Sequence, residues 1–391
     1  MFVYLDNSST TRQYNEVTKI MLSMMEENYG NPSSMHRMGL LAETAVKKAR
    51  KSVATSLGVM EEEITFTSCG TEADNTAILG AAQARKRKGN KIITSQVEHP
   101  AVLEVCKKCE RMGFQVDYIK VDEKGLVDQK ELEQRLDDST ILVSIMAVNN
   151  ELGTVEPIWE IGRMTKEKGD ILFHTDGIQA FGKIDLNIEN VDLLSLSGHK
   201  IHGPKGTGAL YIKKGIHMEP YLLGGGQEKG FRSGTENTPG LAGFGLAADI
   251  ISRTKENRIK KLEQVRHYLL NGIREEIRDI VINSPEFVYE PSNGCGPVCS
   301  PAILNISFLG CRGQVLLHTL EQRDIYVSTG SACSSRKKGS HVLVAAGLAP
   351  SKIESAIRFS FSEFNTIEEM DYVVFELKKA VTGMRKLRKQ R

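Results

Sequence analysis

Lys200 stands in a sequence context that suits covalent chemistry. It ends the run Ser197, Gly198, His199 and Lys200, which follows a β-rich stretch and precedes a Gly-rich turn at residues 203–207. A lysine held at the end of a strand can approach a bound aldehyde and form a Schiff base, which a freely solvated lysine does poorly. A solvated surface charge is the alternative for any single lysine, so other residues must support the chemistry.

A carboxylate and an amide follow another predicted strand. Asp176 comes directly after the strand predicted at residues 171–175, and Gln179 stands three residues later. Parallel-sheet enzymes place ligand groups just outside the carboxyl ends of their strands. An Asp at this place can hold the pyridine nitrogen of a cofactor protonated, and an amide can hydrogen-bond a ring oxygen. The alternative is that Asp176 is only the N-cap of a short helix.

Two more strand ends carry candidate ligand groups. Residues 69–72 join a predicted strand to a helix, so backbone N–H groups and the hydroxyl of Thr71 would point at a phosphate placed there. The alternative is a capping box, with Thr71 as the N-cap and Asp74 at its third position. His99 also follows a strand and suits either an aromatic ring stacked on a flat cofactor or the start of a helix.

Composition and charge exclude several classes of protein. The chain has 391 residues, which suits two domains better than one core. Its 51 basic and 49 acidic residues give a net charge of +2, so the chain has no overall electrostatic field that would attract nucleic acid or an anionic membrane. Residues 385–391 are locally basic, and we expect these charges to be solvated. The first ten residues contain no secretory signal and no membrane anchor, which predicts a cytoplasmic protein with its seven cysteines reduced.

The pattern of apolar residues predicts an α/β fold for the first half of the chain. Short β-rich runs alternate there with helical patterns, which is typical of a wide, largely parallel sheet. The predicted strands are residues 64–68, 91–95, 115–121, 141–148, 171–175 and 192–195, and the predicted helices begin at Thr71 and His99 or cover residues 129–136 and 158–168.

The remaining sequence predicts a second, smaller domain of α+β type. A Gly-rich, charged stretch occupies residues 224–239, and a long helical pattern over residues 241–277 is expected to link the domains. We expect a large domain at residues 15–258 and a small domain formed by residues 1–14 and 259–391. Its predicted elements are residues 280–283, 303–308, 314–322 and 356–361 and a C-terminal helix.

In order and context these residues resemble the cysteine desulfurases of the NifS/IscS group, which are pyridoxal-phosphate (PLP) enzymes of aminotransferase class V. The resemblance covers nearly the whole chain. It implies the fold of PLP-dependent transferases of aminotransferase type I. The matching motifs are Tyr4-Leu5-Asp6-Asn7 with Thr10-Thr11, Gly30-Asn31-Pro32-Ser33-Ser34 with His36, Gly70-Thr71-Glu72-Ala73-Asp74-Asn75, Glu98-His99-Pro100-Ala101, Asn149-Asn150-Glu151-Leu152-Gly153, Ser197-Gly198-His199-Lys200, Arg232-Ser233-Gly234-Thr235 and Ser331-Ala332-Cys333.

The resemblance implies a role for each candidate residue and a homodimeric assembly. The implied roles are Lys200 as the Schiff-base lysine, Asp176 and Gln179 as partners of the ring nitrogen and ring hydroxyl, His99 as the stacking residue and proton shuttle, Gly70, Thr71, Ser197 and His199 as the phosphate site, Thr235 as a ligand of the other subunit's phosphate, and Asn150 and Arg358 as ligands of the substrate carboxylate. A planar guanidinium suits this last role because it can bind a carboxylate through two hydrogen bonds.

Cys333 lies in a segment of small residues with glycines at positions 330 and 339. The resemblance implies that Lys200 moves protons while the Cys333 thiolate attacks the sulfur of L-cysteine, which gives alanine and a persulfide. An acceptor protein of iron–sulfur cluster assembly or tRNA thiolation would then take the sulfur. Two departures from the family pattern are Cys69, where a glycine is commoner, and a shorter, basic segment after Cys333 that contains residues 336–338.

Other functions remain open at this stage. A different PLP enzyme, such as an aminotransferase or a selenocysteine lyase, would need no thiol nucleophile, and the small-residue context of Cys333 argues against the aminotransferase. A catalytically inactive scaffold that binds acceptor proteins is disfavoured because Lys200, Asp176, His99 and Cys333 are all present.

The remaining cysteines have spacings that could bind zinc. Cys106 and Cys109 form one pair, and Cys295 and Cys299 form another. Cys109 shares a helical face with apolar residues, which favours a place in the core, and nothing in the sequence brings the two pairs together. We therefore expect no metal site, although redox or metal chemistry at Cys295 and Cys299 stays open.

Overall fold

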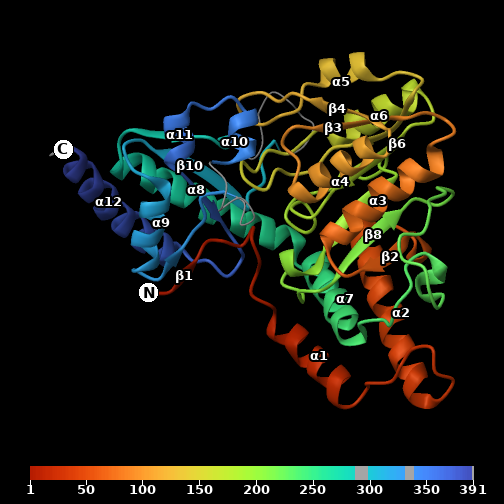
Figure 1. Cartoon of the computed structure of the whole chain (residues 1–391). Helices are drawn as coiled ribbons and strands as arrows, with labels where there is room; N and C mark the ends of the chain where they lie inside the picture. Colours follow the sequence, from red (N-terminus) through yellow and green to blue (C-terminus); the bar gives the residue numbers. More distant parts are fainter. Residues whose placement is uncertain (287–297, 331–338, 390–391) are drawn as a thin grey trace.

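The computed structural model of the chain describes residues 1–286, 298–330 and 339–389, and Figure 1 shows how the elements are arranged. The largest sheet has seven strands in the order β2-β8-β7-β6-β5-β3-β4. Strand β8 runs antiparallel to both neighbours, and the other pairs are parallel, which confirms the predicted sheet. The strands are β2 (Ile64–Thr67), β3 (Lys91–Ser95), β4 (Gln115–Ile119), β5 (Thr140–Ser144), β6 (Leu172–Asp176), β7 (Leu193–Ser197) and β8 (Gly208–Ile212).

Alternate residues of these strands enter two hydrophobic layers, one on each face of the sheet. In β3, Ile92 packs with residues of α3 (Gly70–Arg85) and α4 (Pro100–Arg111). The next residue, Ile93, belongs to the cluster that includes α2 (Arg37–Leu57) and α7 (Thr238–Arg253). Successive side chains of a strand point to opposite faces, so helices on both faces explain why β3, β5, β6 and β7 are buried along their whole length.

Two smaller sheets lie in the other part of the molecule, beside both chain termini (Figure 1). One is antiparallel with the order β12-β10-β9, and the other is the parallel pair β1-β11. The predicted domain boundaries near residues 14 and 258 remain a proposal. The elements here are β1 (Val3–Tyr4), β9 (Ile280–Ile282), β10 (Ile303–Phe308), β11 (Ile325–Tyr326) and β12 (Ala356–Ser360), with α8 (Lys255–Glu276), α9 (Gly313–Glu321), α10 (His341–Ala345), α11 (Pro350–Glu354) and α12 (Ile367–Lys389).

The single helix predicted over residues 241–277 is wrong, because the chain forms two helices there. Helix α7 ends at Arg253 and α8 begins at Lys255. Thr254, between them, has a non-helical backbone (φ −106°, ψ 7°), and both its N–H and its hydroxyl bond to the carbonyl of Ile250. In the part of the chain that the structure describes, no helix combines the length and apolarity needed to cross a membrane.

The N-terminal segment crosses from the smaller sheets to the large one. After β1, the chain runs to α1 (Asn15–Glu26), the red helix of Figure 1. On the way, the N–H groups of Thr11 and Tyr14 donate to the carbonyls of His199 and His202, at 3.1 and 3.0 Å. The first residues of the chain are thereby fixed against the turn that carries Lys200.

Candidate active site

One cavity of about 230 Å³ brings together all of the predicted site residues that the structure describes except Thr235. Several of them meet because β3, β5, β6 and β7 are parallel, so their carboxyl ends share one edge of the sheet, whereas Arg358 comes from β12 of a smaller sheet. A second cavity, of about 450 Å³ beside Trp159, contains none of them. The predicted residues that line the first cavity are Gly70, Thr71, His99, Asn150, Asp176, Gln179, Ser197, His199, Lys200 and Arg358.

Lys200 ends a short 3-10 turn that directly follows β7. Gly198 is required in this turn, because a side chain there would overlap the hydroxyl of Thr207. The Lys200 ammonium donates to the backbone carbonyls of Ser8 and Ser9, the second at 2.8 Å. The N-terminal segment therefore covers the lysine and limits where its amine can point.

Asp176 is the last residue of β6, and its carboxylate is buried. Its Oδ1 accepts the N–H of Ile178 at 2.9 Å, so the carboxylate caps a turn instead of the short helix considered as an alternative. Burial raises the pKa of Asp176 to about 6, although the hydrogen bond and the charge of Lys200 act in the opposite direction. An adjacent cation would favour the ionised form of this carboxylate.

Gln179 reaches the same cavity but is already hydrogen-bonded. Its Nε2 donates to the carbonyl of Ser8 at 2.9 Å, and its Oε1 accepts from the buried Lys183 ammonium at 2.7 Å. Burial, and then the charge of Lys200, lowers the pKa of Lys183 well below its usual value. Gln179 thus links the N-terminal segment to a second buried lysine, which the sequence did not single out.

One end of the cavity has the properties of an anion site. Helix α3 begins at Gly70, and its N-cap residue, Cys69, makes no side-chain capping bond, so the capping box considered as the alternative at Thr71 does not form. The hydroxyl of Ser197 is buried and has no hydrogen-bond partner among the described residues. A side chain in place of Gly70 would overlap Ile178. The N–H groups at the start of a helix and an unpaired hydroxyl beside them fit a phosphate group.

Two histidines face this cavity in the neutral form. His99 is the N-cap of α4, and its Nδ1 accepts the N–H of Ala101 at 3.2 Å, which leaves the ring proton on Nε2. Burial, then the charges of Lys200 and His341, lowers the pKa of His99 to about 4. Burial likewise lowers the pKa of His199 to about 3. Near pH 7 both rings are therefore uncharged.

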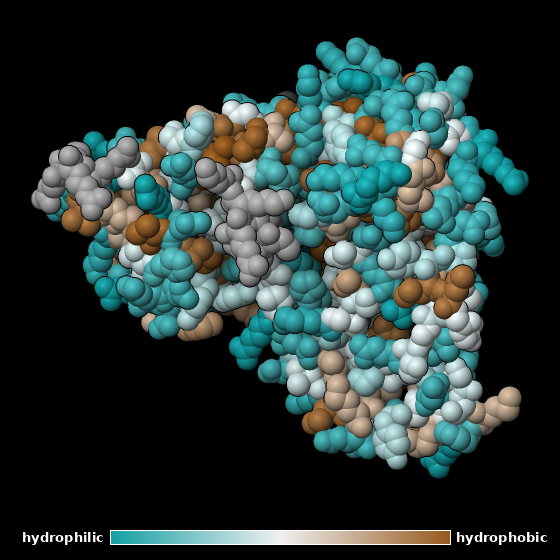
Figure 2. Space-filling model, in the orientation of Figure 1, coloured by the Kyte–Doolittle hydropathy of each residue, from teal (hydrophilic) through white to brown (hydrophobic). Residues whose placement is uncertain are grey.

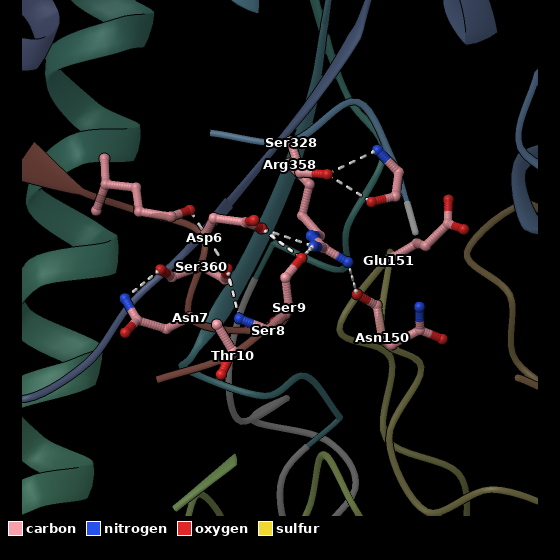
Figure 3. Close-up of polar contacts among 12 residues, drawn as sticks. Asp6, Asn7, Ser8, Ser9, Thr10, Asn150, Glu151, Ser328, Arg358 and Ser360 are labelled. Atoms are coloured by element: carbon pink, nitrogen blue, oxygen red, sulfur yellow. Dashed lines mark hydrogen bonds and ion pairs between the residues drawn. The ribbon is translucent and has the colours of Figure 1, made fainter. Parts of the chain in front are cut away.

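Arg358 joins three separated segments at the cavity, as Figure 3 shows. Its Nη1 donates to the carbonyl of Asn150 at 2.8 Å, and its Nη2 donates to Asp6 Oδ1 and Ser9 Oγ at 2.8 and 2.9 Å. The side chain is 1 % exposed, and its Nε has no partner among the described residues. The guanidinium is thus fixed in orientation while one of its donors remains unpaired.

Of the two remaining predicted site residues, the structure describes only Thr235. Thr235 borders a different cavity, next to Glu228 and Arg232. That loop is tied to the rest of the molecule, because Glu228 accepts from Arg50 and Arg232 pairs with Glu72 at 2.7 Å. Cys333 lies outside the described residues, so its role is still a prediction.

Comparison with known proteins identifies the family. The model of the family "Aminotransferase class-V" matches residues 3–373. The chain belongs to this family. Among curated class V relatives, the chain is 43% identical to "Cysteine desulfurase IscS" of Clostridium botulinum, over 98% of this chain and 96% of the relative. It is 44% identical to "Cysteine desulfurase 1" of Trichormus variabilis, over 98% and 94% of the two chains.

Solved structures of class V enzymes agree with this assignment. A "NIFS-LIKE PROTEIN" superposes with a TM-score of 0.90 at 39% identity and covers 98% of this chain and 100% of its own. A structure titled "SspA in complex with cysteine" superposes with a TM-score of 0.80 at 33% identity, over 93% and 100% of the two chains. The predicted family resemblance and fold class are thereby confirmed.

Most of the described cysteines of this class V chain are buried. Cys106 and Cys109 are buried in α4 and face the core, as predicted for Cys109, and burial raises the pKa of both thiols. Cys299 is also buried, with its sulfur 3.5 Å from the guanidinium of Arg266, whereas Cys295 lies outside the described residues. Cys69 differs because it lines the cavity.

Proposed function

We propose that this chain is a PLP-dependent cysteine desulfurase that converts L-cysteine to L-alanine and passes the sulfur to Cys333 as a persulfide. The observation that carries the proposal is the single cavity that combines a strand-end lysine, a buried aspartate, an anion site and an oriented arginine. The names of the relatives, cysteine desulfurases at 43% identity over nearly the whole chain, support the same reaction.

The cavity residues fit PLP by their chemistry. Lys200 would hold the cofactor covalently, Asp176 would face the ring nitrogen, and the N-terminus of α3 with the unpaired Ser197 hydroxyl would hold the phosphate. His99 would stack on the ring and Gln179 would lie beside its hydroxyl. When bound, PLP supplies an electron sink that stabilises a carbanion next to the substrate nitrogen.

The protein residues would handle protons and orientation. Arg358 and Asn150 would hold the carboxylate of cysteine, since the Arg358 guanidinium is oriented by Asp6 and keeps one unpaired donor. Once its amine is released from the cofactor, Lys200 would move the proton of the substrate's α-carbon. The carbonyls of Ser8 and Ser9 accept hydrogen bonds from this amine and so hold it in a defined position. His99 is neutral near pH 7 because its pKa is low, so its ring would meet the cofactor uncharged, with its proton on Nε2 as a hydrogen-bond donor.

The atoms and electrons of the sulfur-transfer step balance without an external oxidant. The Cys333 thiolate forms an S–S bond to the substrate sulfur, the C–S bond of cysteine breaks, and the carbon that loses sulfur gains a proton to give alanine. Cysteine and one protein thiol thereby become alanine and one persulfide. A direct test is to incubate the holoenzyme with cysteine and to measure alanine and protein-bound persulfide together. Alanine without persulfide on any cysteine would contradict a desulfurase.

Arg358 offers a test of the substrate-carboxylate site. We expect Arg358→Lys to lower kcat/KM for cysteine by roughly 10- to 100-fold, because the compact ammonium of a lysine lacks the planar fork that bonds Asp6 and Asn150 and can pair with a carboxylate through two hydrogen bonds. A charged hydrogen bond is worth about 1.5–3 kcal/mol. The loss should appear mainly in KM. Steady-state kinetics would measure it, with the visible cofactor spectrum and Tm as controls for folding. An unchanged KM would place the carboxylate elsewhere.

Assembly and partners extend this proposal. We propose a cytoplasmic homodimer in which Thr235 reaches the phosphate of the other subunit. Thr235 lines a different cavity from Lys200 in its own subunit, which is consistent with a role in the partner's site. The sulfur would pass to an acceptor protein in iron–sulfur cluster assembly or tRNA thiolation, without direct binding of nucleic acid or membrane. Sedimentation analysis would test the dimer, and capture of the acceptor by persulfide-loaded protein would test the partner.

The basic residues after Cys333 suggest how an acceptor docks. Replacing Arg336, Lys337 and Lys338 by Ser should slow sulfur transfer to an acidic acceptor by roughly tenfold or more and flatten its salt dependence, because exposed charges act only over a Debye length of about 8 Å at physiological salt. Alanine production with a small-molecule reductant should stay unchanged. If both rates fell together, the charges would act on the thiol instead; if neither changed, they would be solvated loop charges.

A further inference from the structure

Lys183 is a buried lysine in the segment that follows β6. Hydrophilic side chains cover much of the face of the molecule shown in Figure 2, whereas Lys183 is 6 % exposed. Among the described residues, its amine has one hydrogen-bond partner, Gln179 Oε1 at 2.7 Å, and it forms no ion pair. A charged group is costly to bury without a partner, so neither solvation nor pairing explains why a lysine stands here.

The charges around Lys183 do not favour its ammonium form. Those that act on it most strongly are three cations and one carboxylate, namely Lys200, Arg258, Arg358 and Glu363. Glu363 already has other partners, because it accepts from the Tyr14 hydroxyl and its Oε2 lies 3.1 Å from His202 Nε2. Burial and the three cations lower the pKa of Lys183 well below its usual value. The amine can nevertheless donate to Gln179 in either protonation state, since both forms carry N–H groups.

Lys183 and Ser8 together fix the orientation of the Gln179 amide. Its Oε1 accepts from Lys183 Nζ at 2.7 Å, and its Nε2 donates to the carbonyl of Ser8 at 2.9 Å. The reversed amide would place donor against donor and acceptor against acceptor, because an amide oxygen only accepts and an amide nitrogen only donates. Ser8 takes one of the two N–H groups of Nε2, and the other has no partner in the part of the chain that the structure describes. Gln179 lines the cavity, so this second N–H is available to a bound molecule.

The backbone keeps Gln179 and Lys183 close to each other. They are four residues apart in a run of turns, in which the Lys183 N–H donates to the carbonyl of Ala180 at 2.9 Å. Between them, Gly182 has a φ of +71°, a left-handed conformation that glycine adopts without strain. Ala180 is fully buried, so this segment is packed into the core. The contact between the amine and the amide is thus built into the local fold.

We propose that Lys183 is a positioning residue for the cofactor: its bond to Gln179 Oε1 holds the amide so that Nε2 donates to the hydroxyl oxygen of the PLP ring. The inference rests on the PLP part of the proposed function, in which Lys200 holds the cofactor and Gln179 lies beside the ring hydroxyl. Lys183 would not touch the reacting atoms. Without it, Ser8 alone would restrain an amide whose terminal torsion has broad minima, so the donor would face the ring for less of the time.

A PLP analogue that lacks the ring hydroxyl isolates this single hydrogen bond. Lys183→Met should weaken the binding of PLP to the full-length apoenzyme by roughly 2- to 10-fold, the scale of one neutral hydrogen bond. It should leave the affinity for the analogue at the wild-type value, because the analogue has no oxygen for Gln179 to bind. Titration of the apoenzyme would measure both affinities. An equal loss for PLP and the analogue would overturn the proposal, since Lys183 would then act on packing or on charge.

The double variant Gln179→Ala/Lys183→Met tests whether Lys183 acts through the amide. Once the amide is absent, Lys183→Met should cause no further loss of PLP affinity. The visible band of the holoenzyme gives a second measurement, because a donor to the ring oxygen favours loss of the Schiff-base proton. Lys183→Met should therefore raise the pH midpoint of this band by roughly half a unit to one unit, and should not move it in the Gln179→Ala protein. A shift that persisted without the amide would show a direct effect of charge and refute the positioning role.

Lys91→Met is a matched control for the loss of a buried lysine. Lys91 is 5 % exposed, and its amine pairs with Asp137 at 2.9 Å. It is the first residue of β3, at the end of the strand away from the cavity. We expect this variant to bind PLP like the wild type. If Lys91→Met weakened PLP binding as much as Lys183→Met, the specific role of Lys183 would be refuted.

The same titrations distinguish this inference from the proposed function. A wild type that bound no PLP would overturn the proposed function and the role of Lys183 with it. A wild type that bound PLP, with Lys183→Met binding it equally tightly, would overturn the role of Lys183 alone. Lys183→Leu repeats the measurement with a side chain of another shape, and the Tm of each variant would confirm that it is folded.

Discussion

Lys200→Ala should give a folded protein that forms no Schiff base and releases alanine from cysteine at least roughly 1000-fold more slowly than the wild type. In the proposed function the lysine would both fix the cofactor and move the proton, and loss of one positioned proton-transfer group alone costs about 10²- to 10⁴-fold. Visible absorption would measure the covalent cofactor, a coupled assay would measure alanine, and Tm would confirm folding.

Lys183 provides the matched control for this experiment. It is a second buried lysine near the cavity, bonded to Gln179, and burial lowers its pKa, so it is the described residue best suited to replace the Lys200 amine. We expect Lys183→Met to keep the covalent cofactor. If Lys200→Ala stayed coloured and the double variant did not, Lys183 would be the true attachment point.

The positions of Asp176 and Lys200 could be predicted from the sequence because the signal is local. Both follow short apolar runs that form buried strands, β6 and β7, with every residue buried. The carboxyl ends of neighbouring parallel strands meet at one edge, so chemistry-bearing residues just after such runs are brought together whatever the details of packing. The same rule placed His99 and the start of α3 at the cavity.

The contacts of the N-terminal segment could not be predicted in the same way. Lys200 bonds the carbonyls of Ser8 and Ser9, 191 and more residues away, and backbone carbonyls have no sequence signature. The motif around Asp6 was recognised as part of the resemblance, but nothing local indicated its ion pair with Arg358, 352 residues away. Such pairings depend on how the two parts of the molecule pack.

The break between α7 and α8 shows a different limit. An apolar helical pattern continues through Thr254, so the sequence predicts one helix. The break consists of non-helical dihedral angles at Thr254 alone. It lets α7 pack on α2 while α8 packs on α12. Helix propensities of single residues differ by well under about 1 kcal/mol, which packing easily outweighs.

Cys333→Ala should keep the coloured cofactor and bind cysteine, yet carry no additional sulfur at this position and lose alanine production by roughly 100-fold or more. In the proposed function, the cavity residues Lys200, Asp176 and Arg358 would hold the cofactor and the substrate, and this change replaces none of them. Cleavage of the C–S bond, by contrast, would need a thiolate to receive the sulfur. Mass analysis of the tryptic peptides after one turnover would locate the persulfide, and the visible spectrum would show that cysteine still binds.

Cys69 is the rival nucleophile that this experiment must exclude. Among the described cysteines it is the one that lines the cavity, beside Gly70 and Thr71 at the proposed phosphate site. A bound phosphate would place negative charge next to its sulfur, and this disfavours a thiolate there. We therefore expect Cys69→Ser to form persulfide on Cys333 at close to the wild-type rate. Extra sulfur on Cys69 in the Cys333→Ala protein, with alanine production retained, would move the nucleophile to the start of α3 and leave residues 331–338 without a catalytic thiol.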